Sequence, residues 1–285
     1  MKYISGIREV VSAYDTFLVD QFGVLHNGKR VYEGVTETLQ SLKQPGKQIY
    51  LISNSGRVNE RNIQRNTSIG LMPELYDGIA TSGQVLYDMM RRRDISLLQK
   101  YGTRVFVIMR DENPLLTGTD YVRTDNLAEA DFIILTGLAD GQQAWNNAVA
   151  LLKQARMYKL PLICSNPDKS MITEGGIAPG SGAVADLYAE MGGEVIFIGK
   201  PFRMIYEYLM QKGAVGRILC IGDSVEHDIA GAVLMGFDSL LITHQGIYQK
   251  ETAGKSAAEN NLLIQRLAEK YRTQCPTYYA DYFRF

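Results

Sequence analysis

The stretch TFLVDQFG, residues 16–23, joins an apolar run to a closing aspartate and a glycine. It is the first of eight short apolar runs: TFLVD (16–20), QIYLIS (48–53), RVFVIM (104–109), DFIILT (131–136), LPLICS (160–165), EVIFIG (194–199), RILCIG (217–222) and DSLLIT (238–243). Such continuous runs are typical of strands that are covered on both faces. Segments of helical length lie between them, at 57–68, 83–93, 142–158, 183–191, 202–212 and 226–235. This alternation predicts an α/β fold with a doubly wound, mostly parallel sheet.

The length and composition narrow the class of protein. The chain has 285 residues, which predicts two domains or one domain with a large insertion. Its 46% hydrophobic and 21% charged residues are ordinary for a globular protein and exclude disorder, collagen and coiled coil. The net charge of −1 argues against binding to nucleic acid or to an anionic membrane through bulk charge. The net charge does not argue against a local basic groove.

The cysteines and the amino terminus indicate the compartment. Cys164, Cys220 and Cys275 are odd in number and widely separated, which favours neither a disulfide framework nor a zinc site. Residues 1–17 have no apolar core of signal-peptide length, and no stretch approaches the roughly 20 apolar residues of a membrane span. We therefore expect a soluble protein in a reducing, cytoplasmic setting.

Four of the apolar runs are closed by a side chain that can handle phosphate or metal, namely Asp20, Ser53, Lys200 and Asp223. Ligands of open parallel sheets bind beyond the carboxyl ends of the strands, so these residues are candidates for one site. Taken alone, Ser53 and Asp223 are at least as well explained as helix N-caps. Asp20 is less easily dismissed, because Gly23 allows a tight turn directly after it.

The order of these segments carries a family resemblance. Asp20 with its turn, then ISNS (52–55), GKP (199–201) and GDSVEHDIAGA (222–232), resembles the haloacid dehalogenase-like (HAD) superfamily, and more closely its subclass IIA phosphatases. ATSG (80–83), SNPD (165–168) and PGSG (179–182) are similar to recurring segments of that subclass. The resemblance implies a HAD-like Rossmannoid core at 1–82 and 195–285, with an inserted α/β cap domain at 83–194.

The resemblance also implies a set of roles around Mg²⁺. Asp20 is the expected nucleophile and a metal ligand, and it would form an aspartyl-phosphate intermediate. Asp223 and the backbone carbonyl of Phe22 are the expected further ligands, while Asp228 would orient metal-bound water. Magnesium would offset the repulsion between the attacking carboxylate and the phosphate.

Other residues are expected to bind the substrate. Ser53 and Lys200 would hold the transferring oxygens, and Lys200 would keep the aspartates ionised. Asn54, Asn166 and Asp168 are the expected substrate contacts. A cap that covers the site limits substrate size, which favours a small phosphorylated metabolite such as a sugar phosphate over nucleic acid, membrane or protein.

One position departs from the family pattern. The superfamily usually has Asp-x-Asp, with the second aspartate as general acid and base, and Phe22 stands there. Such a group typically contributes about 10²–10⁴-fold in rate. His26 or Asp168 is a candidate replacement, although a loop residue and a turn residue respectively explain them as well. The alternatives to a phosphatase are an impaired ligand-binding or regulatory protein and non-phosphatase HAD chemistry.

Two other nucleotide-binding patterns fail. GSGAVA (180–185) matches a dinucleotide fingerprint in letters, but it does not follow a strand and lacks the later acidic residue. No G-x-x-x-x-G-K-[ST] segment exists, which argues against a P-loop hydrolase. The aromatic tail from Tyr278 to Phe285 fits either a final strand or a partner surface. The oligomeric state stays open, with a homodimer as one option because capped relatives often dimerise.

Overall fold

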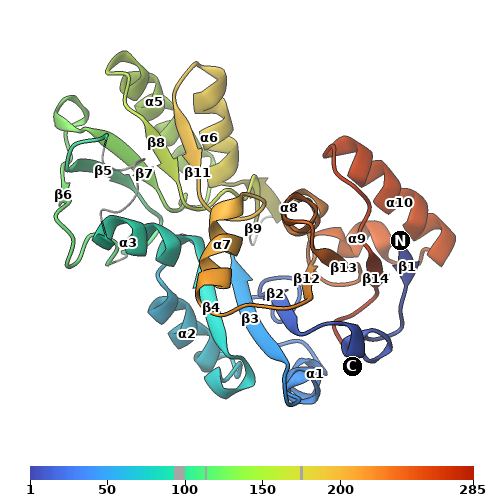
Figure 1. Cartoon of the computed structure of the whole chain (residues 1–285). Coiled ribbons are helices and arrows are strands. Elements are labelled where there is room, and N and C mark those ends of the chain that lie inside the picture. Colours follow the sequence, from blue (N-terminus) through green and yellow to red (C-terminus); the bar gives the residue numbers. More distant parts are fainter. Residues whose placement is uncertain (93–99, 113, 174–175) are drawn as a thin grey trace. The chain divides into compact units, whose positions relative to one another are not determined.

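Two compact units make up the chain in the computed structural model, which describes residues 1–92, 100–112, 114–173 and 176–285. The first unit consists of Met1–Ser53, Asn62–Ala80 and Lys200–Phe285, and the second of Asn54–Arg61 and Thr81–Gly199. The first contains a seven-stranded sheet in the order β1-β14-β13-β12-β2-β3-β4 (Figure 1). Polar side chains at the ends of its central strands make it the unit of interest for function.

The elements around this sheet are short. Its strands are β1 (Lys2–Tyr3), β2 (Thr16–Asp20), β3 (Gln48–Ser53), β4 (Gly78–Thr81), β12 (Ile218–Gly222), β13 (Asp238–Ile242) and β14 (Tyr278–Ala280). The helices of the same stretches of chain are α1 (Val35–Leu42), α2 (Asn59–Ser68), α7 (Arg203–Gln211), α8 (Ala230–Met235), α9 (Gln249–Thr252) and α10 (Ala257–Lys270). Single helical turns occur at Ile7–Glu9, Val11–Ala13, Pro73–Leu75 and Gly246–Tyr248, and a π-helical turn at Val225–Ile229 precedes α8.

Both faces of the seven-stranded sheet are covered. Successive residues of a strand point to opposite faces, and in β13 Leu240 belongs to one buried cluster while Leu241 belongs to another. The first cluster contains Leu39 of α1, and the second contains Ile264 of α10. Pairing is parallel from β1 through to β3. The prediction of a doubly wound, mostly parallel sheet is confirmed.

The register of the central strands sets the position of the candidate site. Asp20 lies opposite Ile52 of β3, and Val19 lies opposite Ile221 of β12. Ser53 and Asp223 therefore follow at the same edge, where the carboxyl ends of the parallel strands meet. This is the edge at which open α/β sheets bind ligands.

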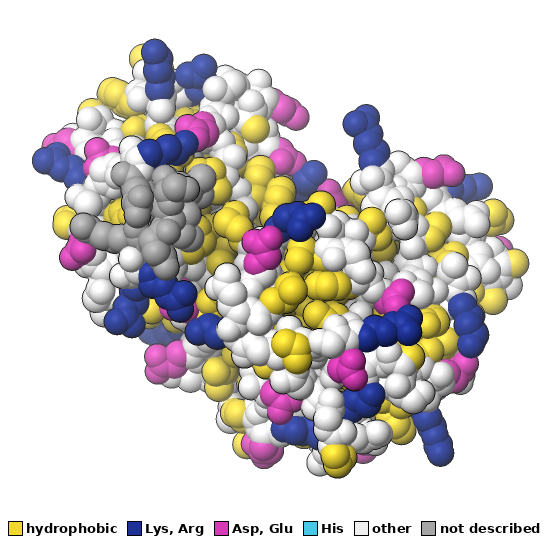
Figure 2. Space-filling view, viewed as in Figure 1, with side chains coloured by type: hydrophobic (Ala, Val, Ile, Leu, Met, Phe, Trp, Pro, Cys, Tyr) yellow, Lys and Arg dark blue, Asp and Glu magenta, His cyan; other side chains and the backbone are white. Residues whose placement is uncertain are grey.

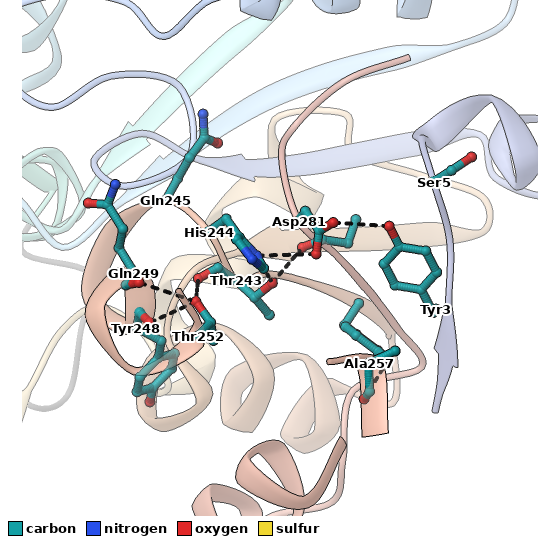
Figure 3. Close-up of polar contacts among 12 residues, drawn as sticks. Tyr3, Ser5, Thr243, His244, Gln245, Tyr248, Gln249, Thr252, Ala257 and Asp281 are labelled. Atoms are coloured by element: carbon teal, nitrogen blue, oxygen red, sulfur yellow. Dashed lines mark hydrogen bonds and ion pairs between the residues drawn. The ribbon is translucent and has the colours of Figure 1, made fainter. Parts of the chain in front are cut away.

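Polar contacts fasten the loop that follows β13 (Figure 3). The Nδ1 atom of His244 lies 3.1 Å from Asp281 Oδ1, and the Tyr3 hydroxyl donates to the other oxygen of Asp281 at 3.1 Å. The Thr252 hydroxyl donates to the Thr243 carbonyl at 2.7 Å. Because β14 pairs with β13, the aromatic tail supplies a final strand, and its end helps to hold residues 243–248 in place.

The second unit is an α/β layer of its own. Its parallel sheet has the order β11-β8-β7-β5-β6 and packs Leu152 of one helix and Val184 of another into its core. The elements are α3 (Ser82–Arg92), β5 (Arg104–Ile108), β6 (Val122–Arg123), β7 (Phe132–Leu135), α5 (Gln142–Met157), β8 (Leu162–Cys164), the hairpin β9 (Ser170–Thr173) and β10 (Gly176–Pro179), α6 (Ser181–Glu190) and β11 (Val195–Phe197). Because β11 pairs with β8, residues 195–199 lie in this unit and not in the core, where the sequence had placed them.

Charges of both signs are mixed on the surface. On the face drawn in Figure 2, the described basic and acidic side chains are interspersed and form no large area of one sign. Among the described helices, every one is too short or too polar to cross a bilayer.

Candidate active site

Lys200 links two carboxylates at the carboxyl edge of the first sheet. Its Nζ lies 2.6 Å from Asp20 Oδ1 and 2.7 Å from Asp228 Oδ1. Asp20 ends β2, whereas Asp228 belongs to the π-helical turn after β12, where its second oxygen accepts from the Ser224 N–H at 3.0 Å. All three side chains are at least 90% buried. Ion pairs so removed from water are strong and geometrically fixed.

Asp223 occupies the next position, directly after β12. Its Oδ2 accepts from the Ile247 N–H at 2.8 Å. Gly246 and Gly23 pack against the carboxylate: a Cβ at Gly246 would lie 1.8 Å from Asp223 Oδ2, and one at Gly23 would lie 2.1 Å from it. Both glycines also have positive φ, which other residues rarely adopt. The backbone around Asp223 therefore leaves room for the carboxylate and for no extra carbon.

Three carboxylates share this small volume. Asp20, Asp223 and Asp228 each offer an oxygen within 4.8 Å of the others. Lys200 balances one of their three negative charges, which leaves a deficit of two positive charges in a buried site. The donors are oxygens only, as hard divalent cations require. By charge and by donor type, the cluster fits a divalent metal ion.

The pKa values of these groups reflect the crowding of buried carboxylates. Burial raises the pKa of Asp20, although Lys200 opposes the rise. Burial, with the charges of Asp20 and Asp228, raises the pKa of Asp223 well above its ordinary value. Burial alone would lower the pKa of Lys200, but its two carboxylate partners raise it. The carboxylates thus need more positive charge than Lys200 supplies, whereas Lys200 stays charged.

Ser53, Phe22 and His26 complete the sequence-predicted residues of this unit. Ser53 is the last residue of β3 and is half-buried. Phe22 is 37% exposed, and its ring stands edge-on to the His26 ring, with 6.1 Å between centroids. His26 is fully buried, and its Nδ1 accepts from the Gly28 N–H at 3.1 Å.

The environment of His26 disfavours the positively charged, doubly protonated form of its ring. Burial, followed by the charge of Arg65, lowers the pKa of His26 to about 4. A ring that has no exposed surface and already accepts a backbone hydrogen bond is suited to organising its loop. These observations support the loop-residue interpretation of His26.

The remaining predicted contacts form a cluster within the second unit. Asn54 Nδ2 donates to Asp168 Oδ1 at 2.8 Å, and Asn166 Oδ1 accepts from the Asp168 N–H at 3.3 Å. The SNPD segment is therefore a turn that Asn166 stabilises, and Asp168 is half-buried at its end. All three predicted substrate contacts thus lie together.

Sequence reasoning missed the groups that position Asp223 and Asp228. The N–H groups of Ile247 and Ser224 hold the two carboxylates, and Gly246 leaves space for one of them. A backbone donor leaves no mark in the side-chain pattern. Gly246 was the available signal, because it comes four residues after β13 ends at the same edge of the sheet.

Comparison with known proteins agrees with this fold. A family model described as haloacid dehalogenase-like hydrolase matches residues 17–115, and a second HAD-like hydrolase model matches residues 197–270. The chain belongs to the HAD superfamily, and within it to the hydrolases.

Individual relatives cover most of the chain. The 5'-nucleotidase YutF of Bacillus subtilis is 28% identical over 252 residues, which are 85% of this chain and 91% of YutF. The sugar-phosphatase AraL of the same organism is 24% identical, covering 82% of this chain and 86% of AraL. The crystal structure of a HAD-like hydrolase from Brucella suis matches with a TM-score of 0.78 at 26% identity, over 98% of this chain and 99% of that one.

Proposed function

We propose that this protein is a magnesium-dependent hydrolase of small phosphomonoesters that works through an aspartyl-phosphate intermediate. Its class, phosphoric monoester hydrolase, is that of the named relatives. The observation that carries the proposal is the buried group of Asp20, Asp223 and Asp228 around Lys200. A surface cluster of acids would lack the desolvation that makes such charges effective.

In this proposal the chain's own oxygens hold the ion. Asp20, Asp223 and the backbone carbonyl of Phe22 would be ligands, and an all-oxygen set with room for water suits Mg²⁺. Bound magnesium would neutralise phosphate charge during transfer. Asp228 has one oxygen on Lys200 and the other on the Ser224 N–H, so it fits a role in orienting metal-bound water and Lys200.

The remaining side chains act on the phosphate. A carboxylate oxygen of Asp20 would bond to phosphorus while the bond to the leaving oxygen breaks. Lys200 and Ser53 would hold the transferring oxygens as charge spreads over them. Asn54, Asn166 and Asp168 would contact the rest of the substrate, and their hydrogen-bonded arrangement favours a small polar molecule. Sugar phosphates are the first class to test, because one relative is named a sugar-phosphatase.

The test is phosphate release from a panel of small phosphomonoesters with and without Mg²⁺. Activity should require the metal and should fall by at least about 10⁴-fold in Asp20→Asn, because the substitution removes the proposed nucleophile. Asp125→Asn is the matched control, since that side chain is 89% exposed. Tight phosphate binding without turnover in the wild type would instead identify a ligand-binding protein.

A further inference from the structure

Phe22 is the exposed, apolar member of an otherwise polar and buried site. It comes two residues after Asp20, and its ring is 37% exposed, whereas Asp20 is 7% exposed. Between them Gln21 is fully buried and accepts from Asn66 Nδ2 at 2.8 Å. The Phe22 ring rests on the loop that follows Asp20, because a Cβ at Gly28 would lie 3.1 Å from Phe22 Cε2. The ring is therefore a candidate contact for whatever is attached to the phosphate.

The charged groups of the first unit around Asp20, and the ring of His26, are buried and contact other parts of the protein. Asp228 accepts from Lys200 and from a backbone N–H, and Asp223 accepts from the Ile247 N–H. Lys200 shares its ammonium between two carboxylates. His26 is fully buried and accepts at Nδ1. Among the described residues, Asp223, Asp228, Lys200 and His26 thus offer little exposed surface from which a proton could reach a leaving oxygen.

The chemistry of the leaving group then decides which substrates react. When Asp20 bonds to phosphorus, the ester P–O bond breaks and its electron pair stays on the leaving oxygen. Without a proton donor, that oxygen departs as an anion and takes its proton from water afterwards. A phenol such as that of tyrosine has a pKa of about 10, whereas water, which resembles an alkanol, is a far weaker acid with a much higher pKa.

The second half of the reaction makes no such demand. Water bonds to phosphorus, the bond from Asp20 to phosphorus breaks, and phosphate leaves while the protons of water pass to phosphate and solvent. The leaving group is then a carboxylate, whose ordinary pKa is about 3.9. Leaving-group selection therefore acts in the first half alone, which kcat/KM reports.

We propose that Phe22 is a specificity-determining residue that makes this enzyme select aryl phosphates, by withholding a proton from the leaving oxygen and by offering its ring to the aromatic group. The inference rests on the proposed phosphatase function, and it puts aryl phosphates ahead of the sugar phosphates named there. Edge-to-face or offset contact with Phe22 favours an aromatic group over a sugar. Acyl phosphates also react without protonation of their leaving group, which is a carboxylate, but they would make no aromatic contact with the ring of Phe22.

The first experiment measures kcat/KM with Mg²⁺ for substituted phenyl phosphates, for glycerol 3-phosphate and for acetyl phosphate. Across the phenols, kcat/KM should fall by about 10²-fold as the leaving phenol becomes less acidic, as Brønsted behaviour predicts for a site without an acid. Glycerol 3-phosphate should be the poorest substrate. A flat dependence on the phenol, or equal turnover of glycerol 3-phosphate, would overturn the proposal and indicate an acid such as Asp168. Preference for acetyl phosphate over every phenyl ester would overturn the role of the ring.

The second experiment changes Phe22 itself. Phe22→Asp should raise kcat/KM for glycerol 3-phosphate by about 10²-fold and flatten the dependence on the phenol. Phe22→Asn has the shape of the aspartate variant but no carboxylic proton to give, so it should neither raise kcat/KM for glycerol 3-phosphate nor flatten the dependence on the phenol. Phe22→Leu should keep the steep dependence and raise KM for phenyl phosphates by about 2- to 10-fold, the loss expected for one aromatic contact.

The outcomes separate the two levels of inference. If Phe22→Asp behaves as Phe22→Asn while both keep the wild-type circular dichroism spectrum and melting temperature, the specificity proposal is wrong although the phosphatase proposal stands. If no phosphomonoester is hydrolysed, or Asp20→Asn retains activity, the proposed function itself is wrong.

Discussion

Replacing Lys200 with methionine tests whether the buried charges are organised as described. Lys200→Met keeps the length of the side chain and removes the ammonium that lies 2.6 Å from Asp20 and 2.7 Å from Asp228. The side chains of Lys200, Asp20 and Asp228 are only 4%, 10% and 4% exposed, so water would screen the two carboxylates little once the ammonium is removed. Removing one partner of such a buried pair costs about 3–5 kcal/mol.

The loss of stability in Lys200→Met should depend on pH, in a direction that follows from the protons bound by the folded and the unfolded state. Burial already raises the pKa of Asp20, and without Lys200 the charge of Asp228 is no longer offset, so Asp20 binds a proton and its folded pKa rises further above the unfolded value of about 3.9. The folded state then binds more protons than the unfolded state, and stability falls as pH rises. Protonating one carboxylate whose ordinary pKa is about 3.9 costs 1.36 kcal/mol for each pH unit above that value, which is about 5 kcal/mol at pH 7.5 and about 1.5 kcal/mol at pH 5. The deficit should therefore shrink to about 1–2 kcal/mol near pH 5.

The assay is urea unfolding followed by circular dichroism at pH 7.5 and pH 5, in EDTA and then in Mg²⁺. Magnesium should recover part of the loss, because it supplies the missing positive charge. Lys153→Met, on the exposed side of α5, should change stability by less than about 0.5 kcal/mol. A Lys200→Met variant within 1 kcal/mol of wild type, with no dependence on pH, would refute the reasoning.

Three further predictions concern the metal site and its loop. Gly246→Ala should weaken Mg²⁺ binding by about 10-fold or more in calorimetric titration, because its Cβ would fall 1.8 Å from Asp223 Oδ2. The control Gly254→Ala has a similar φ but open space around it, and it should bind Mg²⁺ as the wild type does. Equal affinity in the two variants would contradict the packing argument. Mg²⁺ at about 100 times its Kd should stabilise the wild type by roughly 2.7 kcal/mol in thermal unfolding, and it should stabilise Asp223→Asn by much less. An equal gain in both proteins would place the ion elsewhere. His26 is buried with its pKa lowered to about 4, so between pH 6.5 and 4 the unfolded state binds more protons and the free energy of unfolding of the wild type should fall by up to roughly 3 kcal/mol. His26→Asn should lack that part of the fall in urea unfolding at pH 7 and pH 4.5. Parallel pH profiles of the two proteins would disprove the prediction.

The strands that carry the chemistry were predictable because their apolar runs are continuous. TFLVD and QIYLIS coincide with β2 and β3, so the rule about strand ends placed Asp20 and Ser53 correctly along the chain. α1 and α10 were missed, since their amphipathic pattern follows loops and not apolar runs. The strand order could not be read from sequence, because it depends on which distant segments pair.

The polar surroundings of the site were harder to foresee. The N–H groups that hold Asp223 and Asp228 belong to any residue, so only the folded backbone identifies Ile247 and Ser224 as donors. Similarly, the proposal that His26 replaces an acid needed its burial to be known. The boundary near residue 195 shifted because a strand joins whichever sheet has a free edge for it.

The pairing of β1 with β14 has a consequence for biosynthesis. Lys2 lies beside Tyr278, so β1 waits for a partner strand that is synthesised 276 residues later. At about 5–20 residues per second, that wait lasts roughly 14–55 s. The residues of the second unit, which end at Gly199, are complete well before then. The inserted unit can therefore reach its native state during translation while the host sheet is still missing its edge, and a nascent chain stalled near residue 240 should display a folded insert on an unfinished core.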